Sequence, residues 1–276
     1  MNAPQAPKAD AQIDVFAHAF DHILVDRNGP IFEVTINRPG SYNALFGPAH
    51  RELETVFDAY ENDPSLWVAI ITGAGDKTFC SGNDLKATNE GGDILPGPNG
   101  FGALCNRFDR AKPIIAAVNG IAMGGGLEIA LACDLNVAAP HAKFALPEVR
   151  VGLFAAGGGV MRLAGQIGRK AAMELILTRL HFDVARALEL GVINSIAAEG
   201  QTAMDAARDL ATEITLASPQ AVSASLRILN RLEEEGGLVA AFPANLPLFH
   251  KLLETNDAKE GVAAFVEKRA PRWTNS

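Results

Sequence analysis

"AVNGIAMGGGLEIALACDL", residues 117–135, holds the transition that decides the fold. An apolar run gives way to three consecutive glycines, 124–126, and then to an apolar helical pattern with one carboxylate, Glu128. Glycines at a strand-to-helix junction leave backbone N–H groups open to a ligand oxygen, where the helix dipole is positive. The stretch therefore predicts a buried strand, a turn in which Gly125 is a candidate N–H donor to an oxyanion, and a buried helix.

Strand and helix patterns alternate before this stretch. Residues 22–27 and 31–38 alternate in polarity around a turn at 28–30, which predicts a hairpin. Apolar side chains at helical spacing predict a helix over 48–62, and "WVAIIT" at 67–72 has the composition of a buried strand. This order of elements is typical of the α/β class.

The composition predicts one large domain with a helical end. The chain has 276 residues, of which 48% are hydrophobic and 20% charged, enough for a substantial core. Residues 1–20 are expected to form a flexible tail. The C-terminal helical patterns carry surplus Leu and Phe, so we expect 201–276 to pack against another subunit.

Charge and cysteine usage exclude several classes of protein. A net charge of −8 and the absence of a dense Lys/Arg run argue against nucleic acid as a partner. Three cysteines without metal-ligand spacing predict neither a zinc site nor disulfides, and reduced thiols predict a cytoplasmic protein. No apolar stretch is long enough to span a membrane, so no membrane association is expected.

The glycine-rich segments do not match nucleotide-binding loops. "GAGDKT" at 73–78 has Asp76 where a phosphate loop needs glycine, and "GGGLEI" has Ile129 where the dinucleotide fingerprint needs its third glycine. NAD and ATP are therefore not expected as cofactors.

A second turn, "FCSGNDLK" at 79–86, also exposes backbone amides, around Gly82 and Asn83. Two converging amides stabilise a thioester oxygen that becomes an enolate. Glu128 falls one helical turn after Gly125, about 5 Å along the axis, so its carboxylate can face the same cavity. The residues alone leave a second reading open for Glu128, since an acid near a helix N-terminus also complements the dipole.

Glu148 follows Pro147, which ends an extended run. The residues alone leave two possibilities for Glu148, a functional acid or an ordinary exposed acid in a loop. Ser81 and Cys80 lie near the second turn, but no histidine falls in a partner motif, because His141 lies in a predicted turn. Covalent catalysis is therefore not favoured.

The chain resembles the crotonase superfamily, also called the enoyl-CoA hydratase/isomerase family. The resemblance rests on seven blocks in the family's order: "TINRPGSYNAL", "AIITGAGDKTFCSGNDLK", "PIIAAVNGIAMGGGLEIALACDLNVAA", "AKFALPEVRVGL", "GGGVMRL", "AMELILTR" and "ARALELGVINSI". It implies a spiral of ββα units over residues 21–200, and a helical region over 201–276 that builds homotrimers, commonly paired as hexamers.

The resemblance also implies the chemistry. The family's oxyanion amides fall on Asn83 and Gly125, and its two hydratase glutamates on Glu128 and Glu148. The implied reaction is syn addition of water to a trans-2-enoyl-CoA, in which Glu148 supplies the α-carbon proton and Glu128 orients and activates the water.

Coenzyme A enters as part of the acyl-CoA thioester substrate, with no separate cofactor. By resemblance, backbone groups around Ser41, Tyr42 and Ala44, together with Ser81, clasp it, and Lys86 reaches its phosphates. A solvated lysine is the alternative for Lys86. The family often has a basic residue where Ser41 stands.

Like Ser41, the segment "GLFAAGGG" at 152–159 departs from the family pattern. Many hydratases have proline and then glycine at the positions of Ala155 and Ala156. Three alternatives therefore stay open beside hydration: double-bond isomerisation, another acyl-CoA reaction such as thioester hydrolysis or decarboxylation, and acyl-CoA binding without turnover.

Overall fold

The computed structural model describes residues 13–93, 95–178 and 180–276. Its strands are β1 (Ile23–Asn28), β2 (Ile31–Ile36), β3 (Val68–Gly73), β4 (Thr78–Cys80), β5 (Ile114–Val118), β6 (Ile121–Met123), β7 (Leu135–Ala138), β8 (Lys143–Ala145), β9 (Phe182–Asp183) and β10 (Ser195–Ile196). The α-helices are α1 (Gly47–Asn62), α2 (Leu85–Asn89), α3 (Gly125–Ala132), α4 (Gly159–Ile167), α5 (Arg169–Thr178), α6 (Val184–Leu190), α7 (Ala203–Thr215), α8 (Pro219–Glu234), α9 (Leu238–Ala241), α10 (Asn245–Glu254) and α11 (Asn256–Glu267). Short 3-10 helices are η1 (Pro39–Ser41), η2 (Phe101–Ala103), η3 (Glu148–Val151) and η4 (Phe242–Ala244).

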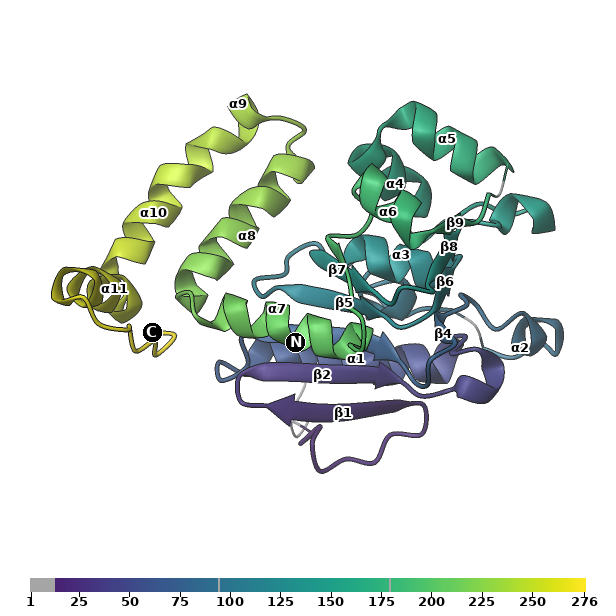
Figure 1. Ribbon diagram of the computed structural model, residues 1–276, viewed down its shortest axis with the longest axis horizontal. Coiled ribbons are helices and arrows are strands. Elements are labelled where there is room, and N and C mark those ends of the chain that lie inside the picture. The colour runs from purple at the N-terminus through teal and green to yellow at the C-terminus, as the bar shows by residue number, and fades with distance from the viewer. Residues whose placement is uncertain (1–12, 94, 179) are drawn as a thin grey trace, which may run out of the picture.

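Two sheets organise the described part of the chain (Figure 1). The larger has six strands in the order β1-β2-β3-β5-β7-β10, and the smaller has four in the order β4-β6-β8-β9. β1 and β2 form the predicted antiparallel hairpin, whereas β2, β3, β5, β7 and β10 run parallel. The α/β class and the strand predicted at 67–72 are confirmed. The two-residue strand β9 was not predicted.

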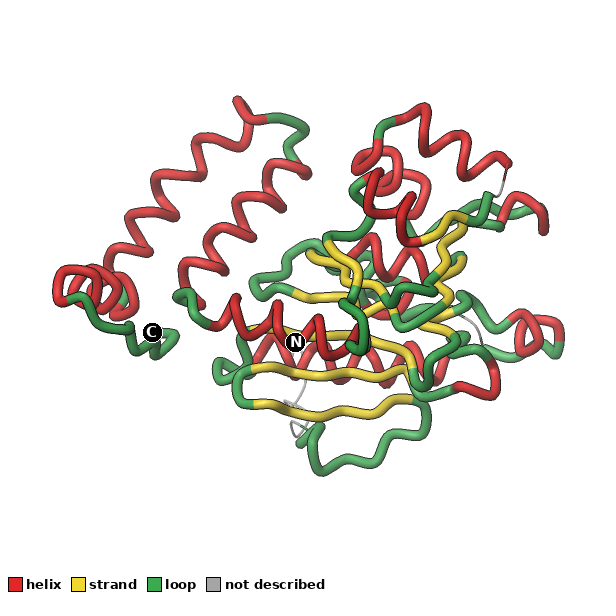
Figure 2. Tube along the Cα trace, in the orientation of Figure 1, coloured by secondary structure: helices red, strands yellow, loops and turns green. Residues whose placement is uncertain are grey.

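Helices cover both faces of the larger sheet (Figure 2). On one face, α7 crosses β3 and β5 and buries Ala203, Ala207 and Ala211, small side chains spaced one turn apart that allow a close approach. On the other face lie α1 and α3. Covered on both sides, β3 and β5 are buried along their whole length, which explains their continuous apolar composition.

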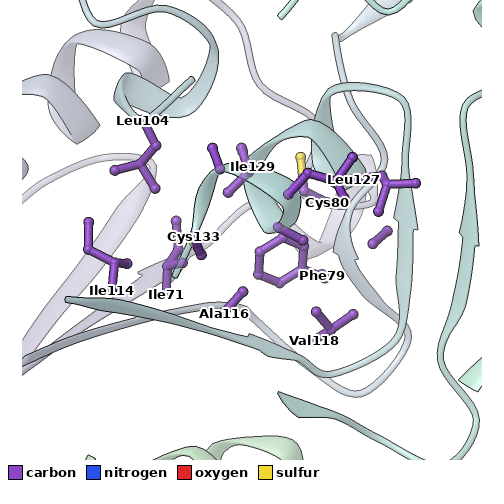
Figure 3. Close-up of a cluster of buried hydrophobic side chains, with 14 of the residues drawn as sticks. Ile71, Phe79, Cys80, Leu104, Ile114, Ala116, Val118, Leu127, Ile129 and Cys133 are labelled. Carbon is purple, nitrogen blue, oxygen red and sulfur yellow. The ribbon is translucent and has the colours of Figure 1, made fainter. Parts of the chain in front are cut away.

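Helix α3 lies in the main hydrophobic core (Figure 3). Every residue of α3 is buried, and Leu127 and Ile129 join Phe79 and Ile71 from the strands in the same cluster. A helix that is apolar on all sides is typical of a fully buried segment. The burial of α3 explains why Glu128 is the one acid within it.

The described N-terminal segment packs against the core, whereas the C-terminal helices extend away from the sheets. Residues 1–12 of the predicted tail lie outside the described residues, whereas Val15 is buried in the main core and Phe16 packs edge-on against Phe32. At the other end, α8, α10 and α11 extend to one side of the sheets (Figure 1). These C-terminal helices leave large apolar side chains exposed, Phe265 by 85%. Among the described residues, no helix has both the length and the apolar composition needed to cross a membrane.

Candidate active site

The three glycines at the start of α3 are explained by what lies against them. Gly124 has a φ of +54°, which favours glycine. A side chain at Gly125 would overlap the ring of Phe101, and one at Gly126 would overlap the backbone carbonyl of Cys80. The N-terminus of α3 can therefore approach Phe101 and the end of β4 only because Gly125 and Gly126 lack a Cβ.

The turn after β4 meets the N-terminus of α3. A Cβ added at Gly82 would lie 3.0 Å from the backbone N of Gly125. The Leu45 N–H donates to Gly82 O at 2.9 Å and the Asp84 N–H donates to Leu45 O at 2.8 Å, which leaves the intervening Asn83 N–H unused by this bridge. Within residues 13–93, 95–178 and 180–276, the N–H groups of Asn83 and Gly125 donate to no protein acceptor. The structure thus brings together the two predicted oxyanion donors, one of them at a helix N-terminus.

Glu128 lies in the first turn of α3, with only 4% of its surface exposed. Its Oε1 accepts the Gly159 N–H at 2.9 Å, and the backbone of Gly157 also stabilises the charged form. Burial has the larger effect and raises the pKa of Glu128. Sequence reasoning missed Gly157 and Gly159 as partners of this carboxylate; the glycine run "GGGV" was the available signal.

Glu148 is the first residue of η3 and faces the same turn. A Cβ added at Gly124 would lie 3.0 Å from Glu148 Oε1, while Glu148 Oε2 is buried and has no hydrogen-bond partner among the described residues. Burial raises the pKa of Glu148 to about 7, and the negative charge of Glu128 adds to the increase. The interaction shows that the two acids lie close enough to influence each other. An acid with an elevated pKa is suited to proton transfer near neutral pH.

The residues predicted to clasp coenzyme A also come together. Tyr42 has a φ of +52°, and its carbonyl accepts the Ser81 N–H at 3.2 Å, while the Ala44 N–H donates to Ser41 O at 3.0 Å. Tyr42 is 63% exposed, so this turn lies at the surface beside the second oxyanion turn. Lys86 lies close by on α2, with its side chain exposed.

Arg38 is a cation of this region that sequence reasoning missed. Its guanidinium donates to Ala44 O and to Asp84 Oδ2, the latter at 3.0 Å, and lies over the ring of Phe46 at 4.1 Å. The charge of Arg38 is therefore used within the protein, and it holds the turn that includes Ala44 beside the turn that includes Asn83.

The two alanines that depart from the family pattern, Ala155 and Ala156, differ in burial. Ala155 is buried, and a Cβ added at Gly159 would lie 2.9 Å from its methyl group. Ala156 is exposed. The Ala155 methyl thus packs beside Gly159, whose N–H holds Glu128.

Other reactive groups near the turns have structural partners. Burial raises the pKa of Cys80 to about 12, and His141 Nε2 contacts Asp76 O at 2.7 Å rather than a thiol or hydroxyl. Covalent catalysis by Cys80 is therefore disfavoured. One surface group of potential metal ligands, Asp21, His22 and Glu52, occurs in the described part of the chain, but Glu52 already accepts the N–H groups of the other two residues.

A mixed α/β spiral with two open N–H groups beside one buried and one half-buried glutamate defines an enzyme of the crotonase class. A sequence model of the enoyl-CoA hydratase/isomerase family matches residues 26–276, and the chain belongs to this family. Its relatives include a carnitinyl-CoA dehydratase of Citrobacter koseri, 42% identical over 252 residues that cover 90% of this chain and 96% of the relative.

Solved structures of enoyl-CoA hydratases are also similar to this chain in sequence and fold. The crystal structure of an enoyl-CoA hydratase from Mycobacterium tuberculosis has a TM-score of 0.87 at 42% identity, covering 92% of this chain and 99% of that one. A carnitinyl-CoA hydratase from Mycobacterium avium has a TM-score of 0.72 at 40% identity, with the same coverage. The crotonase-like fold that the sequence blocks predicted is confirmed.

Proposed function

We propose that the protein catalyses the syn addition of water to a trans-2-enoyl-CoA, forming a 3-hydroxyacyl-CoA, and the reverse dehydration. The observation that carries this proposal is that Glu128 and Glu148 both border the N-terminus of α3, where Gly125 offers an open N–H. Hydration needs one group to activate water and another to protonate carbon, whereas a double-bond shift needs one well-placed base.

The Asn83 and Gly125 N–H groups donate hydrogen bonds to the thioester oxygen in this mechanism. As water attacks the β-carbon, negative charge moves onto that oxygen, and the two donors stabilise the enolate more strongly than the ground-state carbonyl. The positive end of the α3 dipole acts in the same direction.

The two carboxyl groups share one proton in the reactive state. Glu148, with a pKa of about 7, protonates the α-carbon. Glu128, fixed by the Gly159 N–H, orients the water and accepts its proton. After the reaction the proton lies on Glu128 instead of Glu148, so the pair keeps the same total charge.

Coenzyme A binds by the turns that flank this centre. Backbone groups of Ser41, Tyr42 and Ala44, with Ser81, hold the adenine and pantetheine, and Lys86 reaches the phosphates. The exposure of Tyr42 and Lys86 supports this assignment, since a cofactor-sized tail needs an open surface.

The names of the relatives favour a second candidate substrate. Several, at 40–42% identity, are carnitinyl-CoA dehydratases, which suggests an acyl group with a quaternary ammonium. The reaction class stays the same, and only the acyl group differs.

A substrate screen tests both proposals. Purified protein is mixed with crotonyl-CoA, longer 2-enoyl-CoA esters and carnitinyl-CoA, while the conjugated absorbance and the products are followed. Loss of absorbance with a 3-hydroxyacyl-CoA product supports hydration, and a gain of absorbance with carnitinyl-CoA supports dehydration. A shifted double bond, free CoA, loss of carbon dioxide or binding without turnover contradicts the hydratase assignment.

We also propose that the protein assembles as a homotrimer or as a hexamer made of two trimers. Exposed apolar side chains on α10 and α11 support this proposal: Leu246, Phe249, Leu253, Val262, Phe265 and Val266. Light scattering at the assay concentration gives the mass directly, and a monomer contradicts the assembly.

A further inference from the structure

We propose that His50 is a positioning residue, which holds the Phe101–Gly102 turn against the N-terminus of α3 through a hydrogen bond to Nδ1. The inference rests on the proposed function, because it assigns His50 to the support of the Gly125 oxyanion donor. No part of the mechanism above uses His50.

His50 reaches the turn from the first half of α1. Its side chain is fully buried, and its Nδ1 accepts the Gly102 N–H at 3.2 Å. This bond places the ring proton on Nε2. The hydrogen bond joins two segments that are 52 residues apart in the sequence.

The turn held by His50 lies directly on α3. Phe101 packs edge-on against the His50 ring, with 4.7 Å between ring centroids, and its own ring covers Gly125 so closely that no Cβ fits there. Gly102, with a φ of +63°, leaves no room for a Cβ beside Ile129, one turn further along α3. A displacement of this turn therefore changes the contact that borders the Gly125 N–H.

The chemistry of His50 fits an acceptor rather than a passive packing group. Burial lowers the pKa of His50 to about 4, against the opposing effect of Asp93, so the ring is neutral and Nδ1 stays available at neutral pH. Its Nε2 is buried without a hydrogen-bond partner among the described residues. An apolar side chain at position 50 would avoid this unsatisfied donor. Accepting the Gly102 N–H is therefore the role that accounts for a histidine here.

Two substitutions separate the hydrogen bond from the packing. In His50→Asn, Oδ1 takes the place of Nδ1 and keeps the acceptor, although the ring is lost. In His50→Phe, the ring and its contact with Phe101 are kept, but the acceptor is lost. Both variants and the wild type are compared by kcat and KM for crotonyl-CoA hydration, by Kd for the unreactive butyryl-CoA, and by thermal midpoint.

We expect His50→Phe to lower kcat by roughly 10-fold to 100-fold, since small misplacements of catalytic groups have effects of this order. Its affinity for butyryl-CoA falls by about threefold to tenfold, because a ground-state hydrogen bond contributes less. His50→Asn keeps kcat within about threefold of the wild type, because its Oδ1 still accepts the Gly102 N–H. Equal kcat in His50→Phe and the wild type overturns the proposal.

A merely structural role predicts a different pattern. Both variants would then lose activity in proportion to the loss of butyryl-CoA binding sites, with kcat per site unchanged, and that result overturns the proposal. If the wild type hydrates no enoyl-CoA, the proposed function fails separately. In that case the Kd values for butyryl-CoA test the role of His50. Equal Kd values for His50→Phe and His50→Asn overturn that role.

Discussion

The carboxylate of Glu128 is held by the backbone N–H of Gly159, 2.9 Å from its Oε1, so that it lies at the N-termini of two helices at once. Glu128 is in the first turn of α3, and Gly159 is the first residue of α4. Both dipoles favour the carboxylate anion, yet burial keeps its pKa raised. Dipole complementarity and a catalytic role, which the sequence left as alternatives, are therefore compatible in this structure.

Replacing Glu148 by Gln removes the proton donor with little change in shape. We expect hydration of crotonyl-CoA to fall by roughly 10²-fold to 10⁴-fold, the range typical of general acid–base catalysis. The Kd for butyryl-CoA should stay close to the wild-type value, since binding does not require the proton. Glu189→Gln, at an exposed acid paired with Arg186, is the matched control and should retain full activity. Near-wild-type turnover in Glu148→Gln would refute its role.

The pH dependence of kcat/KM should show a falling limb near pH 7. Catalysis needs one proton on the glutamate pair, and with the pKa of Glu148 at about 7 that proton leaves as the pH rises. Above that pH, kcat/KM should fall about tenfold per unit. Hydration consumes no net proton, so initial rates in the dehydration direction must give the same profile. A rate that is flat from pH 6 to 9 contradicts the assignment.

The stability of the protein should also depend on Glu148. A carboxyl whose folded pKa is raised binds its proton more tightly in the folded state, so its contribution favours folding at low pH and declines from about pH 4.5 to 7. Relative to the wild type, Glu148→Gln should therefore gain stability as the pH rises through this window. Denaturant titrations at pH 5 and pH 8 measure the difference, and a constant difference contradicts the pKa shift.

Gly126→Ala tests the close approach of α3 to β4. The added methyl group overlaps the Cys80 carbonyl, so we expect destabilisation of roughly 1–3 kcal/mol or more, as for other overpacked cores. Gly165→Ala is the control, because nothing lies within 4 Å of its Cβ position inside α4. There the helix propensity of alanine should stabilise the protein by about 0.5–1 kcal/mol. Thermal unfolding compares them, and equal midpoints would show that α3 can move away from β4.

Arg38→Met tests the support of the coenzyme A turn. The variant loses the hydrogen bonds to Ala44 O and Asp84, so KM for all acyl-CoA esters should rise by about tenfold with kcat little changed, the pattern of lost uniform binding. Arg186→Met removes an exposed arginine from α6 and is the matched control. A selective fall in kcat would instead connect Arg38 to the chemistry.

The sequence predicted the elements that local patterns encode. Alternating polarity defined the β1–β2 hairpin, and β-branched runs defined β3 and β5, since a side chain's face depends on its nearest neighbours along the chain. The family blocks assigned the two hydratase glutamates to Glu128 and Glu148, and the structure places them in the first turn of α3 and at the start of η3. The catalytic roles of these residues stay predictions until activity is measured.

What the sequence determined by itself was the order of strands and helices, the turns that free the Asn83 and Gly125 N–H groups, and two acids near them. What only the tertiary structure decided was how those parts are held: the Gly159 N–H on Glu128, 31 residues away, and the Gly102 N–H on His50, 52 residues away. The physical reason is that local patterns report the geometry of neighbouring residues. Contacts between distant segments depend instead on how the sheets and helices pack, and no pattern within one segment specifies that packing.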